Sequence, residues 1–240
     1  NNETGAKYQV KEAADIIHRA SPDGAVHLDA TQSYMKFPFS VSSVGADMIT
    51  VSSHKIEGPK GVGALYVGAG LLKSKGLSPI VFGGGQEDGL RSGTENVPGI
   101  GAFAEAARVY YNALPQRYQA VSALREYLVE KVSAVCGIEV NLPSGDFAPH
   151  IVSLTVRGMK SETVLNDLSG RKICVSAGSA CSSHDKRLSS ALLAFGKTPD
   201  EADSTIRVSL SFRNTKEELD TFVAALVDVI RVRAKKLSLD

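Results

Sequence analysis

The sequence has little of what marks several common classes of protein. Its 27 basic and 26 acidic residues give a net charge of +1, so no excess of one sign indicates a nucleic-acid or membrane-surface partner. No run reaches the ~18 consecutive apolar residues of a membrane span, and no N-terminal signal or transit pattern is present. We therefore expect neither a membrane nor a nucleic acid among its partners.

Cysteine is also scarce. Cys136, Cys174 and Cys181 form no Cys-x-x-Cys pair and no zinc-like spacing with histidines, so no metal site is predicted. A sparse, odd number of cysteines argues against a disulfide framework and for a reducing compartment, which predicts a cytoplasmic protein.

What the sequence does contain is the composition of a globular protein. Its 240 residues, 43% hydrophobic and 22% charged, suffice for one large or two modest domains. The first residue is Asn1 and not methionine, from which we expect the chain to begin inside a larger protein.

The first half alternates helical and strand patterns, which predicts a parallel sheet. Ala25–Ala30 reads as a buried strand that ends near Asp29, and Met48–Ser52 reads as a second strand followed by Lys55. A third short strand is expected within Gly61–Val67. Ligands of such sheets bind beyond the carboxyl ends of the strands, where Asp29 and Lys55 are both expected.

Two interpretations of these residues stay open from position alone. Lys55 can simply extend its amine to the surface, or it can act as a nucleophile that forms a Schiff base with a carbonyl cofactor. Asp29 and Lys55 can form a plain ion pair. A pyridine cofactor would use both, with the amine as the Schiff-base partner and the carboxylate keeping the ring nitrogen protonated.

A glycine-rich region follows, with Gly83-Gly-Gly85 and Arg91-Ser-Gly-Thr94. Its backbone N–H groups can hold a phosphate, although such loops are often plain connections. The earlier stretch Gly58–Gly63 matches neither a P-loop nor a dinucleotide-binding fingerprint.

We place a domain boundary at Pro115, giving domains 1–114 and 115–240. The second half has an α+β pattern, with a capping box from Thr215 to Glu218 before the last helix. The helices and strands expected around the boundary and beyond it are helices 98–114, 117–135 and 161–168 and strands 137–141, 151–156, 171–175 and 205–210. Within them, Cys174 is expected as a small buried side chain.

Two further residues point to chemistry. Cys181 lies in Ser176-Ala-Gly-Ser-Ala-Cys-Ser-Ser183, a run of small residues that cannot pack as a core element. The thiol is either an incidental exposed cysteine or an accessible nucleophile. Arg207 projects from the polar face of the strand at 205–210 and is either a surface residue or a clamp for a carboxylate.

Taken together, these motifs resemble the cysteine desulfurases of the NifS/IscS-like group, which are pyridoxal phosphate (PLP) enzymes of the class V aminotransferase type. The resemblance covers the whole chain. The motifs that carry it occur in the same order: Asn1-Asn-Glu, His27-Leu-Asp-Ala-Thr-Gln-Ser33, Ser52-Ser-His-Lys-Ile-Glu-Gly-Pro-Lys-Gly61, Arg91-Ser-Gly-Thr94 and Ser176-Ala-Gly-Ser-Ala-Cys-Ser-Ser183.

The resemblance implies a role for each matching residue. Lys55 forms the Schiff base with PLP, Asp29 pairs with its ring nitrogen, and Cys181 takes the sulfur as a persulfide. The other implied roles are cofactor or substrate contacts for Gln32 and Asn2, phosphate binding for Ser52 and His54, a contact from Thr94 to the neighbouring subunit's phosphate, and binding of the substrate carboxylate by Arg207. His54 is also counted with the catalytic residues. His27 is expected to be structural, and His18, His150 and His184 receive no role.

The implied reaction converts L-cysteine to L-alanine and leaves sulfur on Cys181 for transfer to an acceptor or scaffold protein. A homodimer is implied by Thr94. The acceptor pathway stays open among iron–sulfur cluster assembly, tRNA thiolation and cofactor synthesis. The alternatives are another class V PLP enzyme, such as a selenocysteine lyase or an aminotransferase, and an interaction module without catalytic activity.

The sequence departs from the family in one respect, because the large N-terminal segment that precedes the Asn-Asn-Glu motif is not in these 240 residues. The expected fold is therefore α/β, the C-terminal remnant of the large PLP-dependent transferase domain with a mainly parallel sheet, followed by a smaller α+β domain. We expect an uncovered apolar face on this remnant. We also expect the chain alone to bind PLP weakly or not at all.

Overall fold

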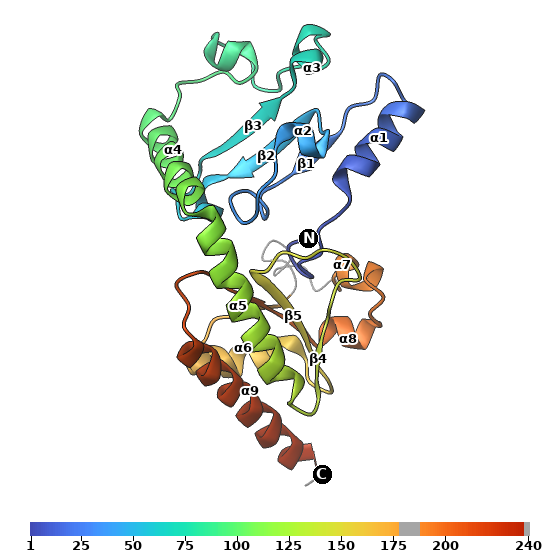
Figure 1. Cartoon of the computed structure of the whole chain (residues 1–240), viewed down its shortest axis with the longest axis vertical. Coiled ribbons are helices and arrows are strands. Elements are labelled where there is room, and N and C mark those ends of the chain that lie inside the picture. The colour runs from blue at the N-terminus through green and yellow to red at the C-terminus, as the bar shows by residue number, and fades with distance from the viewer. Residues whose placement is uncertain (178–187, 238–240) are drawn as a thin grey trace. The chain divides into compact units, whose positions relative to one another are not determined.

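The computed structural model describes residues 1–177 and 188–237 (Figure 1). The chain divides into two compact units. We call Gln9–Pro115 the inserted unit, and Asn1–Tyr8 together with Gln116–Asp240 the host unit. The first eight residues thus pack with a part of the chain that follows more than a hundred residues later, an association that the order of the sequence does not reveal.

The inserted unit contains a three-stranded sheet in the order β1-β2-β3. Strands β1 (His27–Asp29) and β2 (Met48–Ser52) are parallel, as predicted, whereas β3 (Gly63–Val67) is antiparallel to β2. The connection between β2 and β3, residues 53–62, contains only the 3₁₀ turn η1 (Ser53–Ile56) and is shorter than the roughly dozen residues that a parallel crossover needs. The sheet is therefore mixed.

The inserted unit also contains short helices and one long helix. Asn96 begins the long helix by accepting a hydrogen bond from the Gly99 N–H (3.1 Å), and Pro98 occupies its first turn. The helical segments of the inserted unit are α1 (Val10–Ala20), α2 (Val41–Val44), the 3₁₀ turn η1 (Ser53–Ile56), α3 (Ala69–Lys73), the 3₁₀ turn η2 (Gln86–Gly89) and α4 (Val97–Asn112).

The host unit contains a four-stranded antiparallel sheet in the order β4-β5-β7-β6. Its strands are β4 (Ile138–Val140), β5 (Ile151–Val156), β6 (Ser176–Ala177) and β7 (Thr205–Ser209). The helices that accompany it are α5 (Leu114–Ser133), α6 (Ser161–Gly170), α7 (Ser190–Ala194), α8 (Pro199–Asp203) and α9 (Lys216–Leu237).

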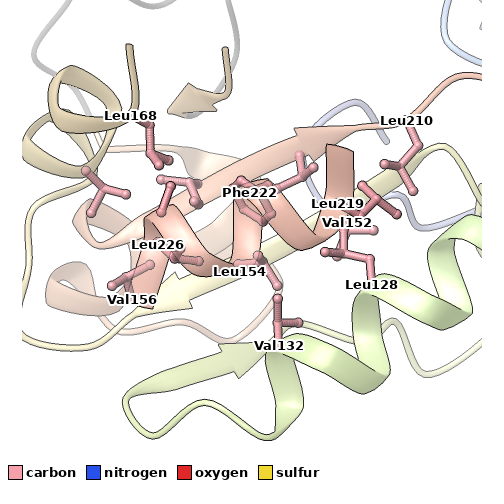
Figure 2. Close-up of a cluster of buried hydrophobic side chains, with 14 of the residues drawn as sticks. Leu128, Val132, Val152, Leu154, Val156, Leu168, Leu210, Leu219, Phe222 and Leu226 are labelled. Carbon is pink, nitrogen blue, oxygen red and sulfur yellow. The ribbon is translucent and has the colours of Figure 1, made fainter. Parts of the chain in front are cut away.

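One face of this sheet forms the main hydrophobic core (Figure 2). Val152, Leu154 and Val156 alternate along β5 and are fully buried. Figure 2 shows side chains of α5 and α9, such as Leu128 and Phe222, directed at this face. Burying aliphatic and aromatic side chains in this way is the principal source of stability for the unit.

Two local predictions in the host unit are wrong and one is confirmed. Residues 171–175 form no strand, because the N–H groups of Arg171 and Ile173 both bond to the carbonyl of Leu168 and complete the end of α6. The pairing strand starts later, at β6, and Cys174 is exposed and not buried. The capping box is present, with the Glu218 N–H donating to Thr215 Oγ1 at 3.3 Å and the Thr215 N–H donating to the Glu218 carboxylate at 3.2 Å.

Candidate functional site

The inserted unit carries a polar face on its sheet. His27 lies opposite Met48, and Asp29 opposite Thr50, in the parallel pair β1–β2. Because alternate residues of a strand share a face, His27, Asp29 and Thr50 project from the same side. A hydrogen bond of 2.6 Å joins the ring Nε2 of His27 to Thr50 Oγ1. This contact orients the exposed His27 ring, and the structural role expected for His27 stays a prediction.

Asp29 ends β1 and is held as a carboxylate. The backbone N–H of Thr31 donates to Asp29 Oδ1 at 2.9 Å. Hydrogen bonds from Thr31, with a smaller contribution from the charge of His27, lower the pKa of Asp29 against the opposing effect of burial. The group therefore stays ionised throughout the neutral range, as an acid that holds a proton on a ring nitrogen must.

Lys55 follows β2 in the turn η1. Its neighbours Ser53 and Ile56 are fully buried, so the turn is anchored while the half-buried Lys55 side chain projects from it. Gly58 closes the turn by donating its N–H to the Ser53 carbonyl (3.1 Å), and a Cβ at this position would lie only 2.1 Å from Ser53 Oγ. Any residue with a Cβ at position 58 would clash with Ser53, so glycine is needed here for the turn that carries Lys55 to close.

The remaining predicted residues of this unit lie on its turns. Ser52 Oγ and His54 Nδ1 are 2.7 Å apart and form a pair of polar groups next to Lys55. Gln32 is half-buried in the turn after β1. Thr94 is exposed in the glycine-rich loop, which is tied down by Ser92 Oγ donating to the Gly84 carbonyl at 2.8 Å.

The opposite face of the same sheet is apolar and carries a cleft of about 830 Å³. Tyr66 of β3, which pairs with Ile49 and shares its face, remains 41% exposed there, so part of this apolar face is uncovered. This cleft is separate from the polar face. Its lining residues are Tyr34, Met35, Phe37, Pro38, Phe39, Ser40, Val41, Ser43, Ile49, Val51, Ala64, Leu65, Tyr66, Tyr111 and Leu114.

The host unit contains Arg207, which is more than a surface residue. Its Nη1 donates to the Asn2 carbonyl at 2.8 Å and its Nη2 to Ser176 Oγ at 3.1 Å. Its Nε is buried and has no acceptor among the described residues. Burial lowers the pKa of Arg207, and the nearby charge of Glu3 partly restores it. A half-buried guanidinium whose Nε has no acceptor among the described residues is suited to binding a carboxylate.

Asn2 reaches Arg207 because the N-terminal residues form a compact turn. Asn1 Oδ1 accepts hydrogen bonds from the backbone N–H groups of Glu3 (2.9 Å) and Thr4 (3.0 Å). Ala6 then forms an antiparallel bridge with Phe147 in the host unit. The sequence predicts a loop here, but not its association with the second half of the chain.

Two functional candidates were missed from the sequence. Glu3, 9% exposed, accepts a hydrogen bond of 2.5 Å from the hydroxyl of Ser189, which begins α7. The Ser189 N-cap pattern is visible in the sequence, whereas no local signal connects it to Glu3, 186 positions earlier.

Cys181 and His184 lie outside the described residues.

The described ranges also bear on metals and membranes. Within residues 1–177 and 188–237 no group of three or more metal-binding side chains is gathered. No helix in the same ranges combines the length and the apolar character needed to cross a bilayer.

Comparison with known proteins identifies the relatives of this chain. The aminotransferase class V family profile matches residues 1–222. "Cysteine desulfurase IscS 1" of Archaeoglobus fulgidus is 37% identical over 230 residues, covering 96% of this chain and 58% of the relative. "NifS/IcsS protein homolog" of Lactobacillus delbrueckii subsp. bulgaricus is 38% identical over 232 residues, covering 95% of this chain and 59% of the relative.

A solved structure agrees with these relatives. The NifS-like protein of Rickettsia africae superposes with a TM-score of 0.85 at 28% identity, covering 95% of this chain and 59% of that one. The chain thus spans less than two thirds of the length of the proteins that it matches.

Proposed function

Because the chain belongs to the aminotransferase class V family, we propose that it carries the catalytic residues of a PLP-dependent cysteine desulfurase. The observation that carries the proposal is the parallel pairing of β1 with β2. This pairing brings the ends of the two strands side by side, where an ionised acid follows one strand and a lysine turn the other. The names of the relatives, cysteine desulfurase and NifS homolog, support the same reaction.

The donor groups of the inserted unit fit PLP. When bound, PLP supplies an electron sink that weakens the bonds at the Cα of an amino acid. With PLP bound, the amine of Lys55 would hold the cofactor aldehyde and would move the Cα proton. The charge of Asp29 would keep the ring nitrogen protonated. Ser52 and His54 would bind the phosphate, and Gln32 would approach the phenolic oxygen.

The host unit supplies the residues assigned to the substrate. Arg207 binds the carboxylate of L-cysteine with the guanidinium donors that the protein leaves free, and Asn2 lies beside it as a further substrate or cofactor contact. The Cys181 thiolate attacks the substrate sulfur. A sulfur–sulfur bond forms as the carbon–sulfur bond breaks, a proton returns to carbon, and the products are L-alanine and a persulfide on Cys181.

The wider assignments follow from the same proposal. The inserted unit is the cofactor-binding part and the host unit the small domain that presents Cys181. Thr94, exposed on its loop, reaches the phosphate of a neighbouring subunit in a homodimer. A sulfur acceptor or scaffold protein takes the sulfur. We also propose that the 240 residues alone bind PLP weakly, because the sheet has three strands and an exposed apolar face.

The proposal is tested by mass spectrometry of the protein incubated with saturating PLP and L-cysteine. The expected result is one L-alanine for each sulfur atom gained on Cys181. Cys181→Ser should lose this product, while the exposed Cys136→Ser should keep it. Lys55→Ala should lose both the product and the visible absorbance of bound PLP, and the exposed Lys60→Ala should retain both.

Two outcomes would count against it. Undiminished sulfur transfer to an acceptor by Cys181→Ser would remove this thiol from the mechanism. Transamination of keto acids, without sulfur release, would indicate an aminotransferase instead.

A further inference from the structure

Two serines flank Cys181 in the chain, and both connect to the N-terminal turn, Ser189 directly and Ser176 through Arg207. Before Cys181, Ser176 on β6 accepts a hydrogen bond from Arg207, which also donates to the Asn2 carbonyl. After Cys181, Ser189 donates its hydroxyl proton to the carboxylate of Glu3. Consecutive residues, Asn2 and Glu3, thus connect to the chain on either side of the cysteine-bearing stretch.

Glu3 is held firmly enough to act as an anchor. Its side chain is 9% exposed, and its backbone N–H donates to Asn1 Oδ1. The segment that follows is fixed to the host unit, because the Ala148 N–H donates to the Gly5 carbonyl at 2.7 Å. The backbone that carries the Glu3 carboxylate is therefore fixed to the host unit.

Ser189 uses both hydrogen-bonding capacities of its hydroxyl. It donates to Glu3 Oε2 at 2.5 Å and accepts from the Leu192 N–H at 3.1 Å, which caps α7. Leu192 is 1% exposed, so the start of α7 is packed into the host unit. A hydroxyl that donates to a carboxylate forms one of the stronger protein hydrogen bonds.

We propose that Glu3 is a positioning residue that fixes Ser189, and with it the end of the cysteine-bearing stretch, during sulfur transfer. The inference rests on the proposed desulfurase function. A nucleophile placed about 1 Å away from its productive position can lose ~100-fold in rate. Arg207 and Glu3 hold residues of the described chain on either side of Cys181 in the sequence, Ser176 before it and Ser189 after it. Glu3 acts through Ser189 and makes no contact with the reacting atoms in this proposal.

Three variants test the proposal. Glu3→Ala removes the acceptor. Glu3→Gln keeps an oxygen that can accept from Ser189 and should rescue most of the loss. Thr198→Ala is the matched control, because Thr198 caps α8, another five-residue helix of the host unit, and makes no contact with Glu3 among its recorded hydrogen bonds.

The first readout needs neither PLP nor activity. Amide hydrogen exchange in the peptide spanning Ser189–Ala194 should rise about tenfold in Glu3→Ala, the effect of losing a hydrogen bond to a charged group. The α9 peptide should not change. Unchanged exchange at α7 would overturn the proposal that Glu3 fixes Ser189, whether or not the protein is a desulfurase.

The second readout is the rate of persulfide formation on Cys181 in a single turnover. We expect Glu3→Ala to lower the maximal single-turnover rate constant at least fivefold, with the half-saturating L-cysteine concentration within twofold of the original and with substantial recovery in Glu3→Gln. Equal losses in Glu3→Ala and Thr198→Ala would make the effect one of stability only and overturn the proposal. If exchange at α7 rises in Glu3→Ala but the unmodified protein forms no persulfide, the hydrogen bond between Glu3 and Ser189 is supported and the desulfurase function is rejected.

Discussion

Arg207 donates a hydrogen bond to the backbone oxygen of Asn2, 2.8 Å away, although 205 positions separate the two residues in the chain. The contact fixes a guanidinium in a half-buried setting while leaving its Nε without an acceptor among the described residues. An arginine that is oriented by a backbone carbonyl, and not by a carboxylate, keeps its charge available to an anionic ligand.

Arg207→Lys should therefore weaken the binding of L-cysteine. Lysine keeps the charge but cannot bind the Asn2 carbonyl, Ser176 and a carboxylate from one planar group. Losing a hydrogen bond to a charged group predicts an increase in KM of about 10- to 100-fold. Steady-state kinetics measure it. Arg157→Lys is the control, since Arg157 is 66% exposed and pairs with Glu139. An unchanged KM in Arg207→Lys would contradict the assignment.

Asp29 should make the stability of the inserted unit depend on pH in the acid range. Thr31 lowers the pKa of Asp29 in the folded protein below its unfolded value. Asp29 thus stabilises the fold above its ordinary pKa, ~3.9, and this contribution disappears as the pH falls through the lower folded value. Asp29→Asn should flatten the acid-unfolding curve below about pH 4, measured by circular dichroism. Asp23→Asn, at an exposed turn position, is the control; equal flattening by both would refute the prediction.

Leu154 tests the core of the host unit. It is fully buried on β5, so Leu154→Ala should lower the free energy of unfolding by about 2–5 kcal/mol. Leu142→Ala, at a site 56% exposed, should change it by less than about 0.5 kcal/mol. Urea unfolding followed by circular dichroism distinguishes the two. Similar losses in both variants would mean that the sheet face shown in Figure 2 is not the stabilising core.

Gly5 tests the N-terminal turn. Its φ of +76° is unfavourable for residues with a Cβ, and a Cβ would lie 3.1 Å from the Ile151 carbonyl oxygen. Gly5→Ala should therefore cost about 1–2 kcal/mol of stability and raise amide exchange in the turn. Gly145→Ala, where a Cβ meets nothing within 4 Å, is the comparison in the same unit. Loss of stability in Gly145→Ala alone would contradict this account.

Features that depend on neighbouring residues in the chain could be predicted from the sequence. The bounds of β2 and β5 match the predicted strands 48–52 and 151–156, because β-branched and aliphatic residues mark each strand over its full length. The alternation along β7 also holds, with Ile206 and Val208 buried and Arg207 on the other side.

Features that depend on distant contacts could not be predicted in this way. The strand expected at 171–175 fails because the end of α6 captures those N–H groups. The polar cluster of Glu3, Ser189 and Arg207 is invisible in the sequence, because each residue alone is typical of a loop, a helix cap or a strand. The roles of the candidate site residues stay predictions until the variants are measured.

The insertion of Gln9–Pro115 between two parts of the host unit has a consequence for biosynthesis. A ribosome makes Asn1–Tyr8 before the inserted unit, whereas their partners at Asp146–Ala148 emerge only after the whole inserted unit has left the exit tunnel. Residues 1–8 therefore lack these partners while the inserted unit is being synthesised. Ser189, which binds Glu3, is made later still, so this hydrogen bond cannot form before α7 has emerged.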